Sequence, residues 1–518
     1  MSSISTVLHG GLVADGRGGD PFLGDVLVTG ERIVAVIPAG QRPAGGYDAE
    51  IVDCSERVVA PGFVDVHSHS DLSLLSYPDN ASRISQGITT EVVGNCGMSP
   101  APGNGDPVGL AKVISTIAVT PDLVWAWSDV AGWLQALEDA PTATNVAALV
   151  GHGSVRFTAS GTSVTALDPD QLAALERELQ VAFAAGVLGV SLGLMYPPGE
   201  SAHRDELASV ARIVAAHDGM LSAHLRDYRT EQLIGSVDEL ADVVDAHGPR
   251  LQLSHLRGIG GGSGFTEALA HVARLRESMD IAADAYPYVH GHTTLIQLLP
   301  SEVRVAGTDG VLRACITSPR AIAELFEAAG YQPHQLIIMK AARTPEAVGR
   351  DLTDADGNPW RWLVELLVAN DGNVDVAAES GLWSDVDLAL EMPWISIASD
   401  GTALDACHRA SAAHPRSWGA FSRGYRHLRD HGIGIGAAVQ RLSTGPAARA
   451  GLRSGIEPGG QADLVVLDDA RFDSTATFGR PAQPSVGLDH VYVNGTAVLG
   501  SGRPTGARPG RLIRKDHS

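Results

Sequence analysis

The sequence has few cysteines, a shortage of basic residues and no long apolar run, and each shortage excludes a class of protein. The four cysteines are widely spaced over 518 residues and form no paired motif: Cys54, Cys96, Cys315 and Cys407. This pattern favours a reducing compartment over a disulfide framework. No apolar run approaches the ~20 residues that span a bilayer, and the N-terminal stretch shows no secretory pattern. We therefore expect a cytoplasmic protein with no membrane partner.

Acidic residues outnumber basic ones, 60 Asp and Glu against 38 Lys and Arg, which gives a net charge of −22. Nucleic acids and anionic membrane surfaces need a basic footprint, so neither is an expected partner. Hydrophobic residues make up 44% and charged residues 19% of the chain, as in a well-buried globular protein. The length suits an α/β barrel of about 250 residues or more with an attached smaller domain.

The two ends of the chain have the same texture, in which short β-prone runs alternate with Gly- and Asp-rich turns. Near the N-terminus such runs occur between residues 4 and 60, and near the C-terminus they include Ala462–Leu467 and His490–Gly495. Chain termini often lie close together in space. We therefore predict one composite β-sandwich domain, built from residues 1–60 plus 455–518.

The central residues, 61–454, alternate apolar runs with helical patterns, which is typical of parallel strands joined by crossover helices. Eight runs are expected to be strands: Phe63–His69, Thr89–Asn95, Asn145–Gly151, Val187–Gly193, Met220–His224, Leu251–His255, Ile281–Tyr286 and Trp394–Asp400. Eight such units predict a (β/α)8 TIM barrel. The long segment 301–393 contains its own strand-like run and is predicted to be an insertion over the barrel mouth.

Polar residues follow these runs at the C-terminal ends of the predicted strands, where barrel enzymes carry their chemistry. In the first run Asp65 and a His-x-His pair share one face of an extended strand. A lone buried cysteine or a lone histidine at a strand end is usually structural. Thiolate, imidazole and carboxylate together are ligands of zinc. The coincidence of six such residues predicts a metal site: His67, His69, Cys96, His224, His255 and Asp400.

A different chemistry is also compatible with the sequence. Gly189–Gly193 matches the Gly-x-Ser-x-Gly nucleophile elbow, and Asp400 and His414 follow in the chain order of a serine hydrolase. A serine hydrolase that uses Ser191 is therefore an alternative, although the prolines at 197 and 198 interrupt the helix that should follow an elbow.

Two more histidines, His427 and His431, lie four residues apart on an expected helix. The glutamate of a zinc-protease motif does not accompany them. We therefore expect these two side chains to lie on a solvated face of the helix.

Short motifs occur in order along nearly the whole chain. They are Pro61–His69, Gly94–Gly97, Gly151–Arg156, Gly193–Gly199, Ala223–Asp227, Ser254–Arg257, Asp284–Tyr288, Ser399–Gly401, His414–Arg416 and Pro458–Val466. In these motifs the chain resembles the amidohydrolase superfamily, and specifically its N-acyl-D-amino-acid deacylase (D-aminoacylase) family.

The resemblance implies a barrel with a composite β-sandwich and a tight zinc site made by Cys96, His224 and His255. A second, weaker metal site would use His67, His69 and Asp400. Related enzymes often bridge two metals with a carboxylated lysine, but none of the three lysines is expected at the end of the fourth strand: Lys112, Lys340 and Lys515. The thiolate of Cys96 is consistent with this absence.

The implied activity is hydrolysis of a small-molecule N-acyl-D-amino acid to a carboxylate and the free D-amino acid. Zinc would lower the pKa of a water molecule from ~16 towards ~7 and polarise the amide carbonyl. Asp400 would take the proton of the water and pass it to the leaving amine. An amidohydrolase that acts on another linear or cyclic amide, like a hydantoinase, is an alternative. A metal-free scaffold is a further one, which the full ligand set disfavours.

The resemblance also suggests how the carboxylate of the substrate is bound. Arg416 would form a bidentate ion pair with it, and Tyr286 or Tyr288 would donate a hydrogen bond. Arg257 stands where many relatives carry lysine, and His290–His292 replaces an Ala-Gly-Ser segment. These departures predict an altered substrate pocket, in which Arg257 favours an acidic side chain or binds the α-carboxylate.

Overall fold

The computed structural model describes residues 4–41, 48–114, 123, 125–163, 165–304, 306–405 and 414–515. Cys407 lies outside these residues. Among the helices of the described part of the chain, none is long and apolar enough to cross a membrane. The described strands form a nine-stranded sheet from the chain ends, a parallel barrel with one extra strand, and a small three-stranded sheet.

The barrel consists of eight parallel strands in sequence order, so the predicted (β/α)8 TIM barrel is confirmed. The strands are β6 (Phe63–Asp65), β7 (Ile88–Val93), β8 (Asn145–Gly151), β9 (Gly189–Gly193), β10 (Met220–His224), β11 (Arg250–Leu253), β12 (Ile281–Ala285) and β16 (Ile395–Ile397). Two backbone hydrogen bonds connect the segments that follow the first and last strands. The amide of Asp400 donates to His67 O at 2.9 Å, and the amide of His69 donates to Gly401 O at 2.8 Å. Three of the six predicted metal ligands, His67, His69 and Asp400, therefore lie at the seam where the barrel closes.

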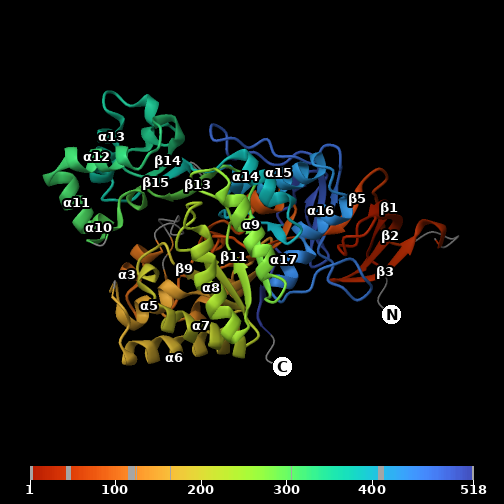
Figure 1. Ribbon diagram of the computed structural model, residues 1–518. Coiled ribbons are helices and arrows are strands. Elements are labelled where there is room, and N and C mark those ends of the chain that lie inside the picture. The colour runs from red at the N-terminus through yellow and green to blue at the C-terminus, as the bar shows by residue number, and fades with distance from the viewer. Residues whose placement is uncertain are drawn as a thin grey trace.

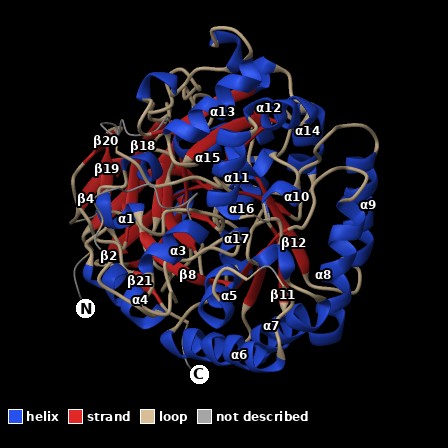
Figure 2. Ribbon diagram, turned by 90° about the vertical axis from the view of Figure 1, so that its left-hand side faces the viewer, coloured by secondary structure: helices blue, strands red, loops and turns tan. Residues whose placement is uncertain are grey.

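Helices surround the barrel strands, as Figures 1 and 2 show. Helix α6 (Pro169–Ala185) illustrates how the sequence sets the ends of a helix. At its start the carboxylate of Asp168 accepts a hydrogen bond from the amide of Gln171, and at its end Gly186 has a φ of 102°, in the left-handed region that glycine tolerates. The helices outside the insertion are α1 (Ser73–Ser76), α2 (Ala81–Ile84), α3 (Pro107–Val113), α4 (Val130–Asp139), α5 (His152–Ser160), α6 (Pro169–Ala185), α7 (Arg204–Ala216), α8 (Leu233–His247), α9 (Gly264–Leu275), α14 (Trp383–Glu391), α15 (Arg416–Asp430), α16 (Ile435–Leu442) and α17 (Thr444–Arg449).

Strands from both chain ends form one nine-stranded sheet, in which β5 and β17 pair antiparallel and join the N-terminal part to the C-terminal part. Its strands are β1 (Thr6–Val13), β2 (Phe22–Thr29), β3 (Arg32–Pro38), β4 (Glu50–Asp53), β5 (Val58–Pro61), β17 (Leu464–Leu467), β18 (Leu488–Val493), β19 (Thr496–Gly500) and β20 (Arg503–Pro504). The last strand, β21 (Leu512–Ile513), is not part of this sheet and pairs parallel with β8 of the barrel.

Between β12 and β16 the chain builds a unit with its own sheet and core, seen in green and teal at the upper left of Figure 1. The sheet has the order β13 (His290–Thr294), β15 (Val374–Glu379), β14 (Leu336–Ala341). Its helices are α10 (Ser301–Arg304), α11 (Gly307–Thr317), α12 (Pro319–Ala328) and α13 (Pro359–Ala369). Ile338, Phe326 and Trp360 are among the buried residues of its separate core. The insertion was predicted at residues 301–393. The sheet of this unit begins earlier, at residue 290, and α14, which lies within the predicted bounds, packs against β12 and β16 of the barrel.

Candidate metal centre

The C-terminal ends of the barrel strands deliver all six predicted ligands to one place. Cys96 follows β7, His224 ends β10, His255 follows β11, and Asp400 follows β16. Cys96, His255 and Asp400 have φ values of 54°, 34° and 46°. Such left-handed backbone is uncommon outside glycine and collects at functional sites, where the surrounding structure holds a strained residue in place.

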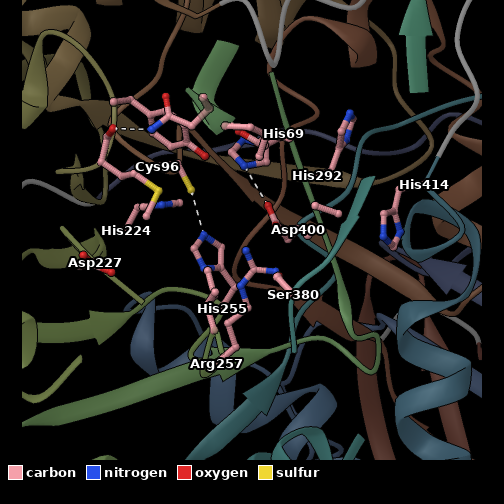
Figure 3. Close-up of a pocket in the computed structure, with 18 of the residues that line it drawn as sticks. His69, Cys96, His224, Asp227, His255, Arg257, His292, Ser380, Asp400 and His414 are labelled. Carbon is pink, nitrogen blue, oxygen red and sulfur yellow. Dashed lines mark hydrogen bonds and ion pairs between the residues drawn. The ribbon is translucent and has the colours of Figure 1, made fainter. Parts of the chain in front are cut away.

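The side chains converge closely. Cys96 Sγ lies 3.3 Å from His67 Nε2 and 3.4 Å from His255 Nε2, and Asp400 Oδ1 lies 3.0 Å from His69 Nε2. Ligand atoms of His67, Cys96, His255 and Asp400 all lie within 4.8 Å of one another. Figure 3 shows the labelled members of this group directed toward one another.

His224 completes the group, with its ring centroid 4.5 Å from that of His255. Both of its ring nitrogens are buried and lack a hydrogen-bond partner in the described structure, which is costly for an imidazole unless something else binds it. Sulfur, nitrogen and oxygen donors at these distances fit a zinc ion. The division of the six residues into a tight and a weak site is not resolved by these distances and stays a prediction.

The charges of the group favour metal-binding protonation states of Cys96 and His224. Burial raises the pKa of Cys96, but His67, His255 and His224 outweigh it and hold this pKa well below its ordinary value. Burial and the neighbouring His255 lower the pKa of His224 to about 4. At neutral pH the site therefore offers a thiolate and a neutral imidazole, the forms that coordinate metal ions.

The charges of the group act differently on His67 and His69. Burial lowers the pKa of both side chains, but Asp284 and Cys96 hold that of His67 well above its ordinary value, and Asp400 and Cys96 raise that of His69 to about 9.

The carboxylate of Asp284 contacts two of the ligands and orients them. Asp284, at the end of β12, accepts a hydrogen bond from the amide of His255 at 2.7 Å, and its Oδ1 lies 3.2 Å from His67 Nδ1. Such partners fix the tautomer and direction of a metal-binding histidine. The sequence reasoning did not assign this role to Asp284, although the residue lies within a quoted motif at a strand end. Asp65 instead accepts from the amide of Ser399 at 3.0 Å and braces the barrel seam.

The serine-hydrolase alternative is wrong, because Ser191 supports the loop that carries Cys96. Its Oγ is buried, donates to Gly94 O at 2.5 Å and accepts from the amide of Gly97 at 2.9 Å. A Cβ at Gly94 would lie 2.0 Å from Leu149 O, so the loop needs glycine for its close approach as well as for its φ of 81°.

A cavity of about 560 Å³ opens above the metal ligands. Five of the six predicted ligands line its floor: His69, Cys96, His224, His255 and Asp400. The insertion supplies another part of the wall, including His292, Thr293, Gln297 and Tyr331. Tyr196 also lines the cavity, and its ring centroid lies 4.8 Å from that of His224. The sequence did not single out Tyr331, which lies in the insertion and far along the chain from any barrel strand. Tyr196 was also missed, although it follows β9 by three residues and lies within the quoted motif Gly193–Gly199.

Arginines line the cavity, and most of them are paired with acidic side chains. Arg416 NH1 lies 2.7 Å from Asp400 Oδ2, and its guanidinium lies 4.8 Å from the ring centre of Tyr286. Arg226, Arg229 and Arg304 pair with Glu239, Asp227 and Glu200, respectively.

Arg257 differs from the other cavity arginines. Its NH1 donates to the hydroxyl of Tyr286 at 2.9 Å, its Nε has no hydrogen-bond partner, and no ion pair to it is found among the described residues. A buried guanidinium without a carboxylate partner is costly, so this side chain is suited to an anionic group of a ligand.

Tyr288 lies outside the wall of this cavity, in contrast to the prediction. The chain turns after β12, where the amide of Tyr288 donates to Tyr286 O at 2.9 Å. The two side chains therefore do not share a face as they would in a continuous strand. The ring of Tyr288 packs under Arg423, 4.9 Å from its guanidinium carbon, and 5.4 Å from the ring centroid of His414.

Comparisons with known proteins define the class of this molecule. Residues 50–219 match the family model described as "Amidohydrolase family". Together with two relatives that match over the full length, this match makes the chain a metal-dependent amidohydrolase, an enzyme that hydrolyses amide bonds.

Comparisons over the full length are more specific. The chain is 32% identical to an N-acyl-D-glutamate deacylase and 32% identical to a D-aminoacylase, both of Alcaligenes xylosoxydans xylosoxydans, covering 100% and 98% of this chain and 98% and 97% of those proteins. The chain belongs to this D-aminoacylase family, as its motifs predicted.

Solved structures support the same family assignment. The N-acyl-D-glutamate deacylase of Bordetella bronchiseptica, complexed with zinc and a phosphonate inhibitor that mimics the tetrahedral intermediate, superimposes with a TM-score of 0.81 at 30% identity, over 99% of this chain and 100% of that chain. A D-hydantoinase, with a TM-score of 0.58 at 12% identity over 99% and 100% of the two chains, shares the fold alone. The deacylase prediction is thus favoured over the hydantoinase-like alternative.

Proposed function

We propose that this enzyme hydrolyses N-acyl-D-amino acids in a zinc-dependent reaction and releases a carboxylate and the free D-amino acid. The observation that carries the proposal is the convergence of Cys96, Asp400 and the strand-end histidines, in a chain that is 32% identical over its whole length to deacylases of this kind. The D configuration and the linear amide rest on what those relatives act on.

Cys96, His224 and His255 would hold zinc tightly, and His67, His69 and Asp400 would form a second, weaker position. The thiolate character of Cys96 and the two unpartnered nitrogens of His224 support this assignment. Bound zinc would supply Lewis acidity, which acidifies water and polarises the amide carbonyl.

Asp400 would move the proton. Burial raises its pKa, but Arg416 and the hydrogen bond from His69 outweigh burial, so that the pKa lies well below its ordinary value. The ionised carboxylate can accept a proton from water on one oxygen and then deliver it to the leaving amine. Arg416, 2.7 Å from Oδ2, would hold the carboxylate in place between these two transfers.

Arg257 would bind the α-carboxylate of the substrate, with the hydroxyl of Tyr286 beside it. Its missing acidic partner favours it over Arg416, which already pairs with Asp400. A guanidinium fork matches a carboxylate bidentately. The side chain of the substrate would extend toward His292 and the insertion wall, where this chain departs from the family pattern.

Two coarser expectations belong to the same proposal. The division into a composite β-domain, residues 1–60 plus 455–518, and a hydrolase barrel, residues 61–454, is supported by a core cluster made of chain-end residues alone, such as Val26 and Leu464. Other chain-end residues, such as Val465 and Val493, share the core cluster of the barrel. The scattered free thiols favour a reducing, cytoplasmic setting.

A substrate screen tests the function directly. Purified enzyme with zinc is incubated with N-acetyl and longer N-acyl derivatives of D- and L-amino acids, and free amine is measured over time. We expect amine release from D substrates. Hydrolysis of hydantoins or other cyclic amides with no release from any N-acyl amino acid would overturn the proposal.

A further inference from the structure

A second group of metal-binding side chains lies away from the barrel cavity, between helices α14 and α15, which lie side by side in Figure 1. Asp387 lies on α14, and His427 and His431 lie one turn apart at the end of α15. One ligand atom of each residue lies within 4.8 Å of the ligand atoms of the other two. None of the three residues lines the cavity above the barrel centre.

The hydrogen bonds of the two histidines leave suitable ring nitrogens available. His431 Nδ1 lies 2.9 Å from the carbonyl oxygen of His427. A carbonyl only accepts, so Nδ1 carries the proton and Nε2 keeps its lone pair, as in histidines that bind metals through Nε2. His427 Nε2 is buried, has no hydrogen-bond partner in the described structure and lies 3.5 Å from Asp387 Oδ1.

His431 is exposed, as the sequence suggested, but His427 does not lie on a solvated face. The side chain of His427 is only 13% exposed, while Asp387 is 40% exposed and His431 is open to solvent. An ion pair with Asp387 would satisfy His427 if it were protonated. Burial and the neighbouring His431 lower the pKa of His427, however, although Asp387, Asp430 and Glu391 act in the opposite direction. The hydrogen bond from His431 Nδ1 to the carbonyl oxygen of His427 caps the helix and does not involve Nε2.

We propose that Asp387, His427 and His431 form a second binding site for a divalent transition-metal ion, accessible from the surface and separate from the barrel centre. Two imidazoles and one carboxylate suit zinc, nickel and copper better than calcium or magnesium, which prefer oxygen ligands. The exposed side of the group leaves room for water to complete the coordination.

An ion at this site would tie α14 to α15 close to the cavity. α14 follows Ser380, which lines the cavity, and α15 begins at Arg416, which pairs with Asp400. Crosslinking the two helices would therefore stabilise the elements that lead into the cavity wall.

The test titrates enzyme with Ni²⁺ by isothermal titration calorimetry, after loading with zinc and dialysis until the same zinc content per chain, that of the tight barrel centre, remains in wild type and variants. Wild type is compared with His431→Ala, at a site exposed enough to tolerate the change, and with His334→Ala, which removes an exposed histidine elsewhere on the surface. We expect wild type and His334→Ala to bind one equivalent of Ni²⁺ more than His431→Ala. Any binding at the barrel centre is common to all three proteins and cancels in the comparison.

Two further measurements distinguish a specifically bound Ni²⁺ ion from Ni²⁺ that associates loosely with the surface. Asp387→Asn should weaken the extra equivalent by about tenfold or more, and Ni²⁺ should raise the melting temperature of wild type but not of His431→Ala. Basal turnover with zinc should be the same in all variants. Equal Ni²⁺ stoichiometry in wild type and His431→Ala would overturn the proposal.

Discussion

The sulfur of Cys96 lies 3.3 and 3.4 Å from the Nε2 atoms of His67 and His255, with no disulfide to explain its position. We expect Cys96→Ala to lose both its tightly held zinc and its turnover, because a thiolate is the strongest zinc ligand of the group. The measurement is zinc per chain after dialysis, together with amide hydrolysis.

Cys54 provides the matched control for Cys96. It is also buried, but burial raises the pKa of its thiol to about 12, so it is an inert core residue. Cys54→Ala should keep its zinc. Full zinc content in Cys96→Ala after dialysis would exclude the thiolate as a ligand.

The carboxylate of Asp400 contacts histidines on one side and Arg416 on the other. Asp400→Asn keeps the shape of the side chain but removes the base, so turnover should fall by about 10² to 10⁴-fold. Most of the zinc should remain, because Cys96, His224 and His255 are unchanged. Asp227→Asn, in the same cavity but paired with Arg229, should retain activity. An active Asp400→Asn enzyme would contradict the assigned role.

Arg257 is the cavity arginine that we assign to the carboxylate of the substrate. Arg257→Met should lower kcat/KM by about 10- to 100-fold, since charged hydrogen bonds contribute about 1.5–3 kcal/mol. Most of the loss should be in KM. Arg229→Met is the control, because Arg229 is already paired with Asp227. If both variants keep wild-type KM values for N-acyl amino acids, the carboxylate binds elsewhere.

The strand-end residues of the site could be predicted from the sequence because a strand end is a local feature. Once eight parallel strands close, His67, Cys96, His224, His255 and Asp400 must meet at one rim. Tyr288 could not be placed in the same way, since a turn after β12 redirects its side chain. Residues such as Tyr331 reach the cavity only through the packing of the insertion, which no local pattern reveals.

At the level of elements, Asp463 connects the sheet of the chain ends to the barrel. It accepts from the amide of Asn494 at 2.6 Å and from the side chain of Asn145, the first residue of β8, at 3.0 Å. Burial raises its pKa from 3.8 to about 6, although these hydrogen bonds oppose the shift. The folded protein therefore prefers the protonated form of Asp463 more strongly than the unfolded chain does.

The raised pKa of Asp463 predicts a pH dependence of stability. As pH rises from about 4 to about 6, ionisation costs the folded state up to about 3 kcal/mol. Asp463→Asn carries no such cost. The melting temperature of wild type should therefore fall relative to that of Asp463→Asn between pH 5 and pH 7, and the difference should stay constant above pH 7. A difference that does not vary between pH 5 and pH 7 would contradict this account.

Strand pairing separates what the sequence could predict from what it could not. The barrel strands follow from apolar runs that recur between helical segments, and the observed β8 and β10 match their predicted bounds. The insertion is different, because β13 pairs with β15 across a chain separation that includes four helices. Such pairing depends on long-range packing, so the sequence indicated β14 but not its neighbours.

For the whole molecule, the metal centre acts as a crosslink, because its predicted ligands come from β6, β7, β10, β11 and β16. Without a metal ion the barrel holds a buried thiolate among histidines, and both nitrogens of His224 are unpaired. Zinc binds only the folded arrangement, so it should stabilise the fold by about 2.7 kcal/mol when free zinc is 100 times its Kd.

Metal removal should therefore lower the melting temperature as well as abolish turnover. Scanning calorimetry before and after dialysis against a chelator measures the first effect, and re-addition of zinc should restore both. In Cys96→Ala the chelator should leave the melting temperature nearly unchanged, because the tight site is already lost. If metal-free and zinc-loaded wild type melt at the same temperature, Cys96, His224 and His255 are not joined by a tightly bound ion, and the centre must be held together by the barrel packing alone.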